Sequence, residues 1–338
     1  MRIREVGRFE DAPVHEIELC NAAGAKAFIL TWGAVVRDLI VPLPSGPRSV
    51  VLGFDSFEPY PNHSRNFGAI IGRFANRIAD GRFSLNGYTY QLTRNDGSIH
   101  HLHGGAGAFG RRIWSLLEAG VNYVTLALLS RDGDSGYPGT LQATCTYRLT
   151  DFATLEIRLT ATTDRATILN LTHHSYFNLV GSGDVAAHRL WLDADFHTPV
   201  RPDSIPTGDI CGVFGTPFDF TELREIGPTD LDMNLVLNRP LCSDRTKPLA
   251  HAATLQSPDE ALAMEVWTTE PGLQLYNGYK LDVAVPGRNN EMYRARAGVA
   301  LETQRFPNSP NVSHFSESTL RPDEVYAQHT EYRFCIKN

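Results

Sequence analysis

Apolar and polar residues alternate in short runs along this chain, a pattern typical of β-strands with one buried and one wet face. The alternation is clearest in Leu141–Leu149 and Leu155–Ala161, two runs joined by a predicted turn at Asp151–Thr154. A second hairpin is predicted over Phe83–Leu92. There Asn86-Gly87 supplies the two positive φ angles that a type I′ turn requires. Both hairpins predict antiparallel pairing.

Ten further segments read as strands, and amphipathic helices are nearly absent. The predicted strands are Val14–Cys20, Lys26–Leu30, Val35–Val41, Ile113–Leu117, Tyr123–Ser130, Ile168–His174, His188–Ala194, Ala261–Thr268, Leu273–Asn277 and Val299–Gln304. Leu223–Ile226 is at most one helical turn, and the longest loops are expected at Thr198–Asp219, Cys242–Ser257 and Pro286–Arg296. Many short strands punctuated by Gly and Pro predict an all-β sandwich or barrel. No flexible linker or repeat interrupts it, which favours one domain over residues 1–338.

The charge balance of the chain limits the kinds of partner that it is expected to bind. The 338 residues carry 31 Lys and Arg against 38 Asp and Glu, a net charge of −7. This leaves no basic surplus for a nucleic-acid backbone. No apolar stretch approaches the ~18–20 residues that cross a bilayer, and no apolar segment of a secretory signal follows Met1–Glu5. The five cysteines are widely spaced and odd in number, as expected of reduced thiols. We expect a cytoplasmic protein that binds neither nucleic acid nor membranes.

One glycine-rich segment has the spelling of a nucleotide-binding loop. Gly105–Gly110 satisfies G-x-G-x-x-G, a motif that requires a buried strand before it and a helix after it. Here Arg111–Trp114 looks like the start of a new strand. A plain glycine loop is therefore the favoured interpretation.

Several polar groups are candidates for other chemistry. His101 and His103 share one face if the segment is extended, whereas His173 and His174 point to opposite faces. A zinc site needs three or four ligands, so the alternative to a metal site is one hydrogen-bonding histidine with the others structural. Asp193, Asp195 and Glu317 are candidates for a glycosidase carboxylate pair, although most acids in such a chain are solvated surface charges.

A concentration of histidine, amide and aromatic residues stands out more. It fills Asn170–Leu179, at the predicted end of a strand, and Leu301–Gln304 ends another apolar run with Glu302 at a position of low exposure. Similar groups recur near Arg77, His103 and Gln274. Flat apolar faces together with fixed donors and acceptors are what a sugar site needs.

At these residues the sequence resembles the aldose 1-epimerase (galactose mutarotase) family, in motifs that run from about residue 15 to residue 334. The matching stretches are Gly53–Asp55, Gly68–Ile78, Leu102–Gly105, Gly136–Gly139, His174–Leu179, Ile205–Gly208, Gly215–Phe220, Thr268–Tyr276 and Leu301–Gln304. The resemblance implies a large antiparallel β-sandwich. It also implies an enzyme without metal or cofactor that interconverts the α and β anomers of free hexoses such as glucose and galactose.

The resemblance assigns roles residue by residue. Glu302 matches the general base of the family and His174 its general acid. The positions that match the sugar-binding residues are Arg77, His103, Asp232 and Gln274, with Asn76 beside them. The family usually reads Asp-His-Asn where this chain has Asp232-Met233-Asn234, with Asp230 two residues earlier, so the loop is altered where substrate preference is set.

A Glu/His pair suits this chemistry, because at neutral pH a glutamate is an anion and a histidine is partly protonated. We expect Asp232 to raise the pKa of His174 and favour its acid form. Two alternatives remain open: a non-catalytic sugar-binding protein, and a sugar-phosphate mutarotase. The latter needs a basic cluster at the pocket, and Arg111-Arg112 is the only adjacent basic pair. The partner is expected to be a monosaccharide, and the assembly a monomer or homodimer.

Overall fold

Strands dominate the structure, a computed structural model that describes residues 2–150, 153–239 and 248–336. In these residues the one α-helix, α1 (Tyr60–His63), is a single turn. Short 3₁₀ turns are η1 (Ala79–Gly81), η2 (Gly105–Gly107), η3 (Phe109–Arg111), η4 (Asp134–Gly136), η5 (Arg288–Asn290) and η6 (Ser309–Asn311). The all-β prediction is confirmed.

Three larger sheets form the framework, and the neighbouring strands in each pair antiparallel. The nine-stranded sheet has the order β11 (Ser115–Ala119), β12 (Tyr123–Ser130), β13 (Leu141–Thr150), β14 (Thr154–Thr163), β28 (Tyr326–Ile336), β24 (Leu262–Thr268), β23 (Ala250–Gln256), β18 (Arg189–Leu192) and β21 (Arg224–Glu225). The six-stranded sheet has the order β17 (Tyr176–Phe177), β26 (Val299–Gln304), β25 (Gly272–Tyr276), β22 (Asp232–Val236), β19 (Phe196–His197) and β20 (Cys211–Gly212). The five-stranded sheet is β1 (Arg2–Phe9), β2 (Ala12–Cys20), β3 (Lys26–Leu30), β4 (Val36–Val41) and β5 (Arg48–Ser49).

Four small two-stranded sheets complete the fold. They pair β7 (Arg77–Ile78) with β10 (His101–Leu102), β8 (Arg82–Leu85) with β9 (Tyr88–Gln91), β6 (Ile70–Ile71) with β16 (Thr172–His173), and β15 (Thr167–Ile168) with β27 (Thr319–Leu320).

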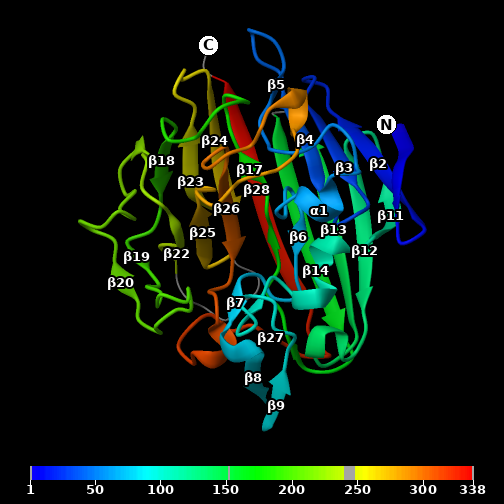
Figure 1. The fold of residues 1–338 in the computed structure, drawn as a ribbon, viewed down its shortest axis with the longest axis vertical. Coiled ribbons are helices and arrows are strands. Elements are labelled where there is room, and N and C mark those ends of the chain that lie inside the picture. Colours follow the sequence, from blue (N-terminus) through cyan, green and yellow to red (C-terminus); the bar gives the residue numbers. More distant parts are fainter. Residues whose placement is uncertain (1, 151–152, 240–247, 337–338) are drawn as a thin grey trace.

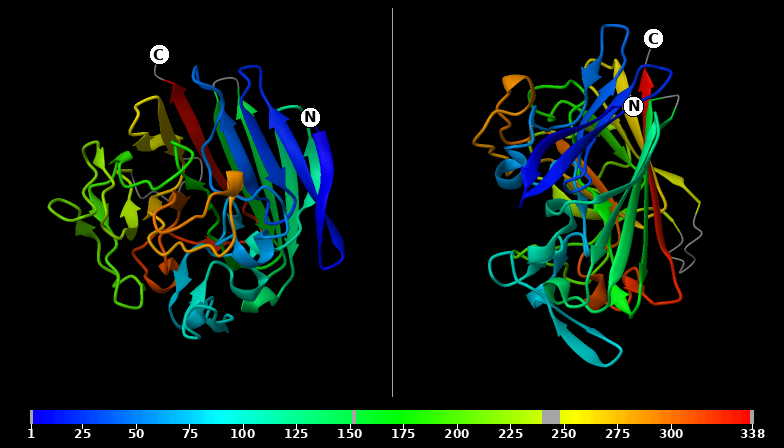
Figure 2. Two further views of the ribbon diagram at one scale, coloured as in Figure 1. Left: turned by 45° about the horizontal axis from the view of Figure 1, so that its top comes forward. Right: turned by 90° about the vertical axis from the view of Figure 1, so that its right-hand side faces the viewer.

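The five- and six-stranded sheets pack against one face of the nine-stranded sheet, as the two layers in Figures 1 and 2 show. One apolar cluster joins them, with Ile17 from β2, Leu126 from β12 and Leu273 from β25 among its members. Strand β28, drawn in red, lies between β14 and β24 in the middle of the large sheet (Figure 1). The C-terminal segment is thus part of the core.

The predicted hairpins are confirmed. Residues alternate between buried and more exposed along β13 and β14, and Asn86 and Gly87 have φ of 52° and 81° between β8 and β9. Residues 151 and 152 of the predicted turn lie outside the described residues. The predicted strands at Lys26–Leu30, Tyr123–Ser130 and Val299–Gln304 match the observed bounds.

Some local predictions were wrong. Arg224–Glu225 is a short strand rather than a helical turn, because it pairs with β18 at the edge of the large sheet. The expected loop Cys242–Ser257 contains strand β23; its residues 242–247 lie outside the described part. The expected strand Ile168–His174 is split into β15 and β16, which pair with different partners. These outcomes depend on pairing with distant strands, which local alternation does not record.

The four cysteines in the described part of the chain are free thiols: Cys20, Cys145, Cys211 and Cys335. No helix in the described residues is long and apolar enough to span a bilayer.

Candidate active site

One face of the six-stranded sheet carries a row of polar side chains. The register places Gln274 of β25 directly opposite Glu302 of β26 and Asn234 of β22, and residues opposite each other share a face. Asp232 lies two residues before Asn234, so strand alternation returns it to the same face. Gln274 Nε2 donates a hydrogen bond to Asp232 Oδ1 at 2.7 Å. Every residue of β26 is buried, which makes it a rigid central support.

His174 meets Glu302 by continuation of the same pairing. Tyr176 of β17 lies opposite Ala300 of β26, and two residues further in each direction lead to His174 and Glu302. His174 Nε2 lies 3.6 Å from Glu302 Oε1, and both side chains are almost fully buried. The neighbouring His173 points away into the core, where its Nε2 lies 2.7 Å from Ser175 Oγ. The predicted opposition of His173 and His174 is confirmed.

A second histidine, His103, lies at the same site. Its ring is fixed by two residues with left-handed backbone, Asn76 and His103 itself. Asn76 and His103, at the ends of β7 and β10, have φ of 64° and 54°. The His103 N–H donates to the Asn76 carbonyl, and the Asn76 N–H donates to His103 Nδ1, both at 3.1 Å. A positive φ is costly for residues with a Cβ, although Asn and His tolerate it better than most. The reciprocal bonds fix the imidazole of His103.

The same backbone turn corrects a prediction. His101 and His103 do not share a face, because the strand ends at Leu102. His101 instead donates through Nδ1 to the Thr93 carbonyl at 2.7 Å and accepts from the Tyr137 hydroxyl through Nε2 at 2.6 Å. His101 is therefore structural, and His103 alone enters the site.

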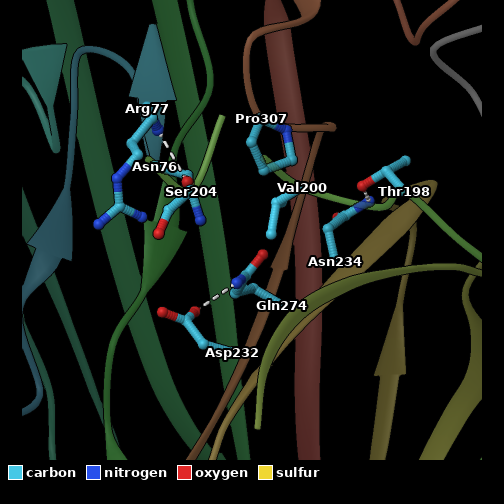
Figure 3. Close-up of a pocket in the computed structure, with 9 residues that line it drawn as sticks. All are labelled: Asn76, Arg77, Thr198, Val200, Ser204, Asp232, Asn234, Gln274 and Pro307. Carbon is cyan, nitrogen blue, oxygen red and sulfur yellow. Dashed lines mark hydrogen bonds between the residues drawn. The ribbon is translucent and has the colours of Figure 1, made fainter. Parts of the chain in front are cut away.

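These side chains surround a cleft with a cavity volume of about 270 Å³, close to the lower end of small-molecule sites. Its lining residues are Arg65, Asn66, Asn76, Arg77, Leu102, His103, His174, Tyr176, Asp232, Tyr276, Lys280, Leu281 and Glu302. Asn76, Arg77 and Asp232 also line a smaller adjoining pocket together with Gln274. Figure 3 shows Asn76 and Arg77 across this pocket from the Asp232–Gln274 pair.

Burial shifts the pKa values of the ionisable side chains in the cleft. Desolvation raises the pKa of Glu302 well above its usual range, and the nearby Asp232 carboxylate adds to this shift while Arg77 opposes it. Desolvation lowers the pKa of His174 to about 4. The expectation that Asp232 raises the pKa of His174 was wrong, since burial dominates. Arg77 is neutralised by Asp96, which lies 2.6 Å from its Nε.

Some buried polar atoms of the described site residues have no hydrogen-bond partner. In the described part of the chain, Glu302 Oε2, His174 Nδ1 and Gln274 Oε1 are buried without a hydrogen-bond partner. A buried polar group without a partner costs free energy. A polyhydroxylated ligand would supply such partners.

His103, His174 and Glu302 bring ligand-type atoms within 4.8 Å of one another, a convergence that the sequence did not reveal. Because His103 Nδ1 accepts the Asn76 N–H, neutral His103 carries its proton on Nε2. That nitrogen is then a hydrogen-bond donor and not a metal ligand. The trio therefore fits a hydroxyl group better than a metal ion.

The structure brings together most of the predicted site residues. The cleft contains Asn76, Arg77, His103, His174, Asp232 and Glu302, and Gln274 lines the adjoining pocket.

Other sequence candidates lie elsewhere. Asp193, Asp195 and Glu317 do not line the cleft. Asp230 pairs with Arg296 instead. The Gly105–Gly110 loop forms η2 and η3 without a following α-helix, as a plain glycine loop would.

Sequence reasoning assigned no role to seven lining residues: Arg65, Asn66, Leu102, Tyr176, Tyr276, Lys280 and Leu281. The two tyrosines stand in motifs already singled out, two residues beyond His174 and Gln274, so strand alternation was the available signal. Arg65 and Lys280 lie in loops and had no such signal.

Comparison with known proteins covers almost the whole chain. The family profile described as aldose 1-epimerase matches residues 15–333. An aldose 1-epimerase from Escherichia coli is 38% identical over 335 residues, 96% of each chain, and a galactose mutarotase from Sus scrofa is 37% identical over 314 residues, 91% of this chain and 90% of that protein. The solved structure of a GalM/aldose epimerase homologue from C. elegans superposes with a TM-score of 0.89 at 32% identity, covering 96% of this chain and 99% of that one.

Proposed function

The chain belongs to the aldose 1-epimerase family, and from this premise we propose that Glu302 and His174 interconvert the α and β anomers of free aldoses in the cleft. The observation that carries the proposal is the buried contact of 3.6 Å between His174 Nε2 and Glu302 Oε1. Galactose is the sugar in the names of several relatives, and we extend the proposal to glucose and other aldohexoses.

Ring opening needs one proton removed and one delivered. Glu302 takes the proton of the anomeric hydroxyl, and the C1–O1 bond becomes a carbonyl. The C1–O5 bond breaks with its electron pair on O5, which takes a proton from His174. Rotation about C1–C2 turns the other carbonyl face toward O5, and closure returns both protons. A positioned acid or base typically contributes ~10²–10⁴-fold.

The buried pair suits this exchange because it needs only one proton in total. The opening step uses the arrangement in which Glu302 is the anion and His174 the cation, and it leaves both groups neutral, which is the arrangement that the cleft favours before a sugar binds. Burial favours neutral forms, as the raised pKa of Glu302 and the lowered pKa of His174 indicate. The two arrangements are tautomers with the same proton count, so no exchange with solvent is needed within a cycle.

The other polar groups hold the sugar during rotation. His103 offers an Nε2–H donor, and the pKa of its imidazolium form is held far below neutral by burial and by the neighbouring His174. Arg77, fixed by Asp96, offers further guanidinium donors, and Asp232 and Gln274 offer acceptors. The rings of Tyr176 and Tyr276, 5.9 Å apart, provide apolar faces.

The test is the decay of optical rotation of fresh α-D-galactose and α-D-glucose. We expect Glu302→Gln to lower the catalysed rate by about 10²–10⁴-fold, because the amide cannot accept the hydroxyl proton as a base. Glu317→Gln is the matched control, since Glu317 is exposed and paired with Arg321. Circular dichroism checks that both variants are folded. A folded Glu302→Gln protein with the wild-type rate would remove Glu302 from the mechanism, and a wild-type protein that binds sugar without catalysis would indicate a non-catalytic sugar-binding protein.

A further inference from the structure

Two cations stand at the mouth of the cleft. Arg65 and Lys280 both line it and both are exposed, whereas Glu302 and His174 are only 2% and 3% exposed at its inner end. Within the described ranges neither cation lies within 4.0 Å of a carboxylate. The third cation of the cleft, Arg77, is already paired with Asp96. The mouth thus holds two positive charges that form no close ion pair in the described residues, and Lys280 acts on the Asp232 carboxyl only at longer range, where it favours the anionic form.

The loops that carry these cations are held in place. Arg65 and Asn66 have φ of 45° and 67°, and left-handed residues of this kind cluster at ligand sites. The Lys280 N–H donates to the Tyr276 hydroxyl at 3.3 Å, and the Lys280 ammonium lies 5.0 Å from the centre of the Tyr279 ring. Lys280 is therefore held beside Tyr276 and Tyr279, and Arg65 extends from a left-handed loop at the same mouth.

The acids of the cleft only partly offset this charge. Desolvation raises the pKa of both Asp232 and Glu302, which disfavours their anionic forms. The chain as a whole carries a net charge of −7, so two cations at the mouth are opposite in sign to the net charge of the protein. Two cations at the entrance of a cleft concentrate ligands of the opposite sign there.

We propose that the cleft accepts aldoses that carry an anionic group, a carboxylate or a phosphate, at the end remote from the anomeric carbon, and that Arg65 and Lys280 bind this group. The inference rests on the proposed function, which places the anomeric carbon between Glu302 and His174 at the inner end. The opposite end of the sugar then faces the mouth. A neutral aldose leaves both cations without a partner there, and an anionic one supplies it.

The test compares kcat/KM for glucose, glucose 6-phosphate and glucuronate in the wild type and in the double variant Arg65→Gln, Lys280→Gln. We expect the ratio of anionic to neutral sugar to fall by about five- to tenfold in the double variant, since an exposed charge pair contributes modestly. Arg111→Gln, an exposed cation outside the cleft that donates to the Pro61 carbonyl, should leave the ratio unchanged. Added salt should lower the wild-type ratio.

The outcomes separate the two hypotheses. A ratio that falls for both anionic sugars supports recognition of any anion, and one that falls for only one of them identifies the carboxylate or the phosphate as the group. An unchanged ratio in the double variant overturns the inference while leaving the proposed function intact. If no sugar is turned over, the proposed function fails; calorimetric binding of the same sugars then supports the inference if the double variant weakens only the anionic ones, and overturns it if not.

Discussion

His103 and His174 are both buried imidazoles of the cleft, and their hydrogen bonds give them different tasks. His103 accepts the Asn76 N–H through Nδ1, which leaves Nε2–H as a permanent donor. His174 Nδ1 has no partner in the described part of the protein, and its Nε2 faces Glu302. His174 is therefore able to exchange its proton, while His103 is held in one tautomer. The chemistry of each ring follows from whether its Nδ1 has a fixed hydrogen-bond partner.

The shared proton of Glu302 and His174 predicts the pH profile of catalysis. In the proposed mechanism activity requires one proton on the pair, so the acid limb should report protonation of His174, whose pKa is about 4. We expect the catalysed rate to hold down to about pH 4, below the ordinary histidine value of about 6.5. The alkaline limb should lie above the ordinary carboxyl range, because the pKa of Glu302 is raised. Polarimetry from pH 3 to 9, corrected for spontaneous mutarotation, measures both limbs. An acid limb near pH 6.5 would mean that His174 is solvated.

At the scale of elements, the site lies between regular strands of the six-stranded sheet and the irregular end of the short β7–β10 pair. Three central strands, β22, β25 and β26, supply one row of acids and amides through their register. The short pair β7 and β10 supplies the other wall through two left-handed residues at its end. Regular pairing gives rigidity, and the left-handed ends turn the two side chains toward the cleft.

Because Asn76 has a left-handed backbone at the end of β7, we can predict how its substitution affects stability and KM. Asn76→Ala and Asn76→Gly both remove the amide, but only alanine resists a φ of 64°. We expect the alanine variant to unfold more easily than the glycine variant by about 1 kcal/mol and to have the higher KM, because a shifted Asn76 N–H no longer holds His103.

Urea denaturation and polarimetry measure the two effects. The same pair of changes at Asn290, an exposed residue with φ of 60° outside the cleft, should alter stability without altering KM. Equal stability and equal KM of the two Asn76 variants would show that the backbone conformation does not position His103.

At the scale of the molecule, one core ties distant parts of the chain together. The main apolar cluster includes residues from Ile17 to Phe334, and β28 joins β14 to β24 at the centre of the large sheet. We propose on this basis that residues 1–338 form a single domain. Asp232 and Glu302 of the six-stranded sheet line the cleft, and that sheet packs on the nine-stranded one.

Buried neutral histidines make the stability of the whole molecule depend on pH. His188 accepts the Leu179 N–H through Nε2 at 3.0 Å, and burial lowers its pKa to about 4. In the unfolded chain it binds a proton below about pH 6.5, so stability is lost as pH falls from 6.5 toward 4.

We expect His188→Gln to reduce the slope of the unfolding free energy against pH by about 1.4 kcal/mol per pH unit in this range, since one fewer proton is taken up on unfolding. Urea denaturation at pH 7 and pH 5 measures this slope. Parallel wild-type and variant dependences would mean that His188 titrates normally in the folded protein.

Local sequence pattern was sufficient for the class of fold and for several strands to the residue, as in Tyr123–Ser130 and Val299–Gln304. Alternation is a property of neighbouring residues, and an Asn-Gly turn is set by two φ angles, so neither needs the rest of the chain. The same reasoning failed at Arg224–Glu225 and at β23, where a partner strand far along the chain creates the element.

The candidate site likewise has features that the sequence determined and features that only the folded structure decided. Motifs pointed to Glu302 and His174 one at a time, and the family resemblance supplied their roles. Their approach to 3.6 Å, the fixed tautomer of His103 and the cations at the mouth depend on strand register and loop conformation. Burial sets the proton affinities as well, and burial exists only after the sheets have packed. The sequence determines which residues are present. The distances between their side chains, and the desolvation of those side chains, depend on the pairing of segments that are remote along the chain.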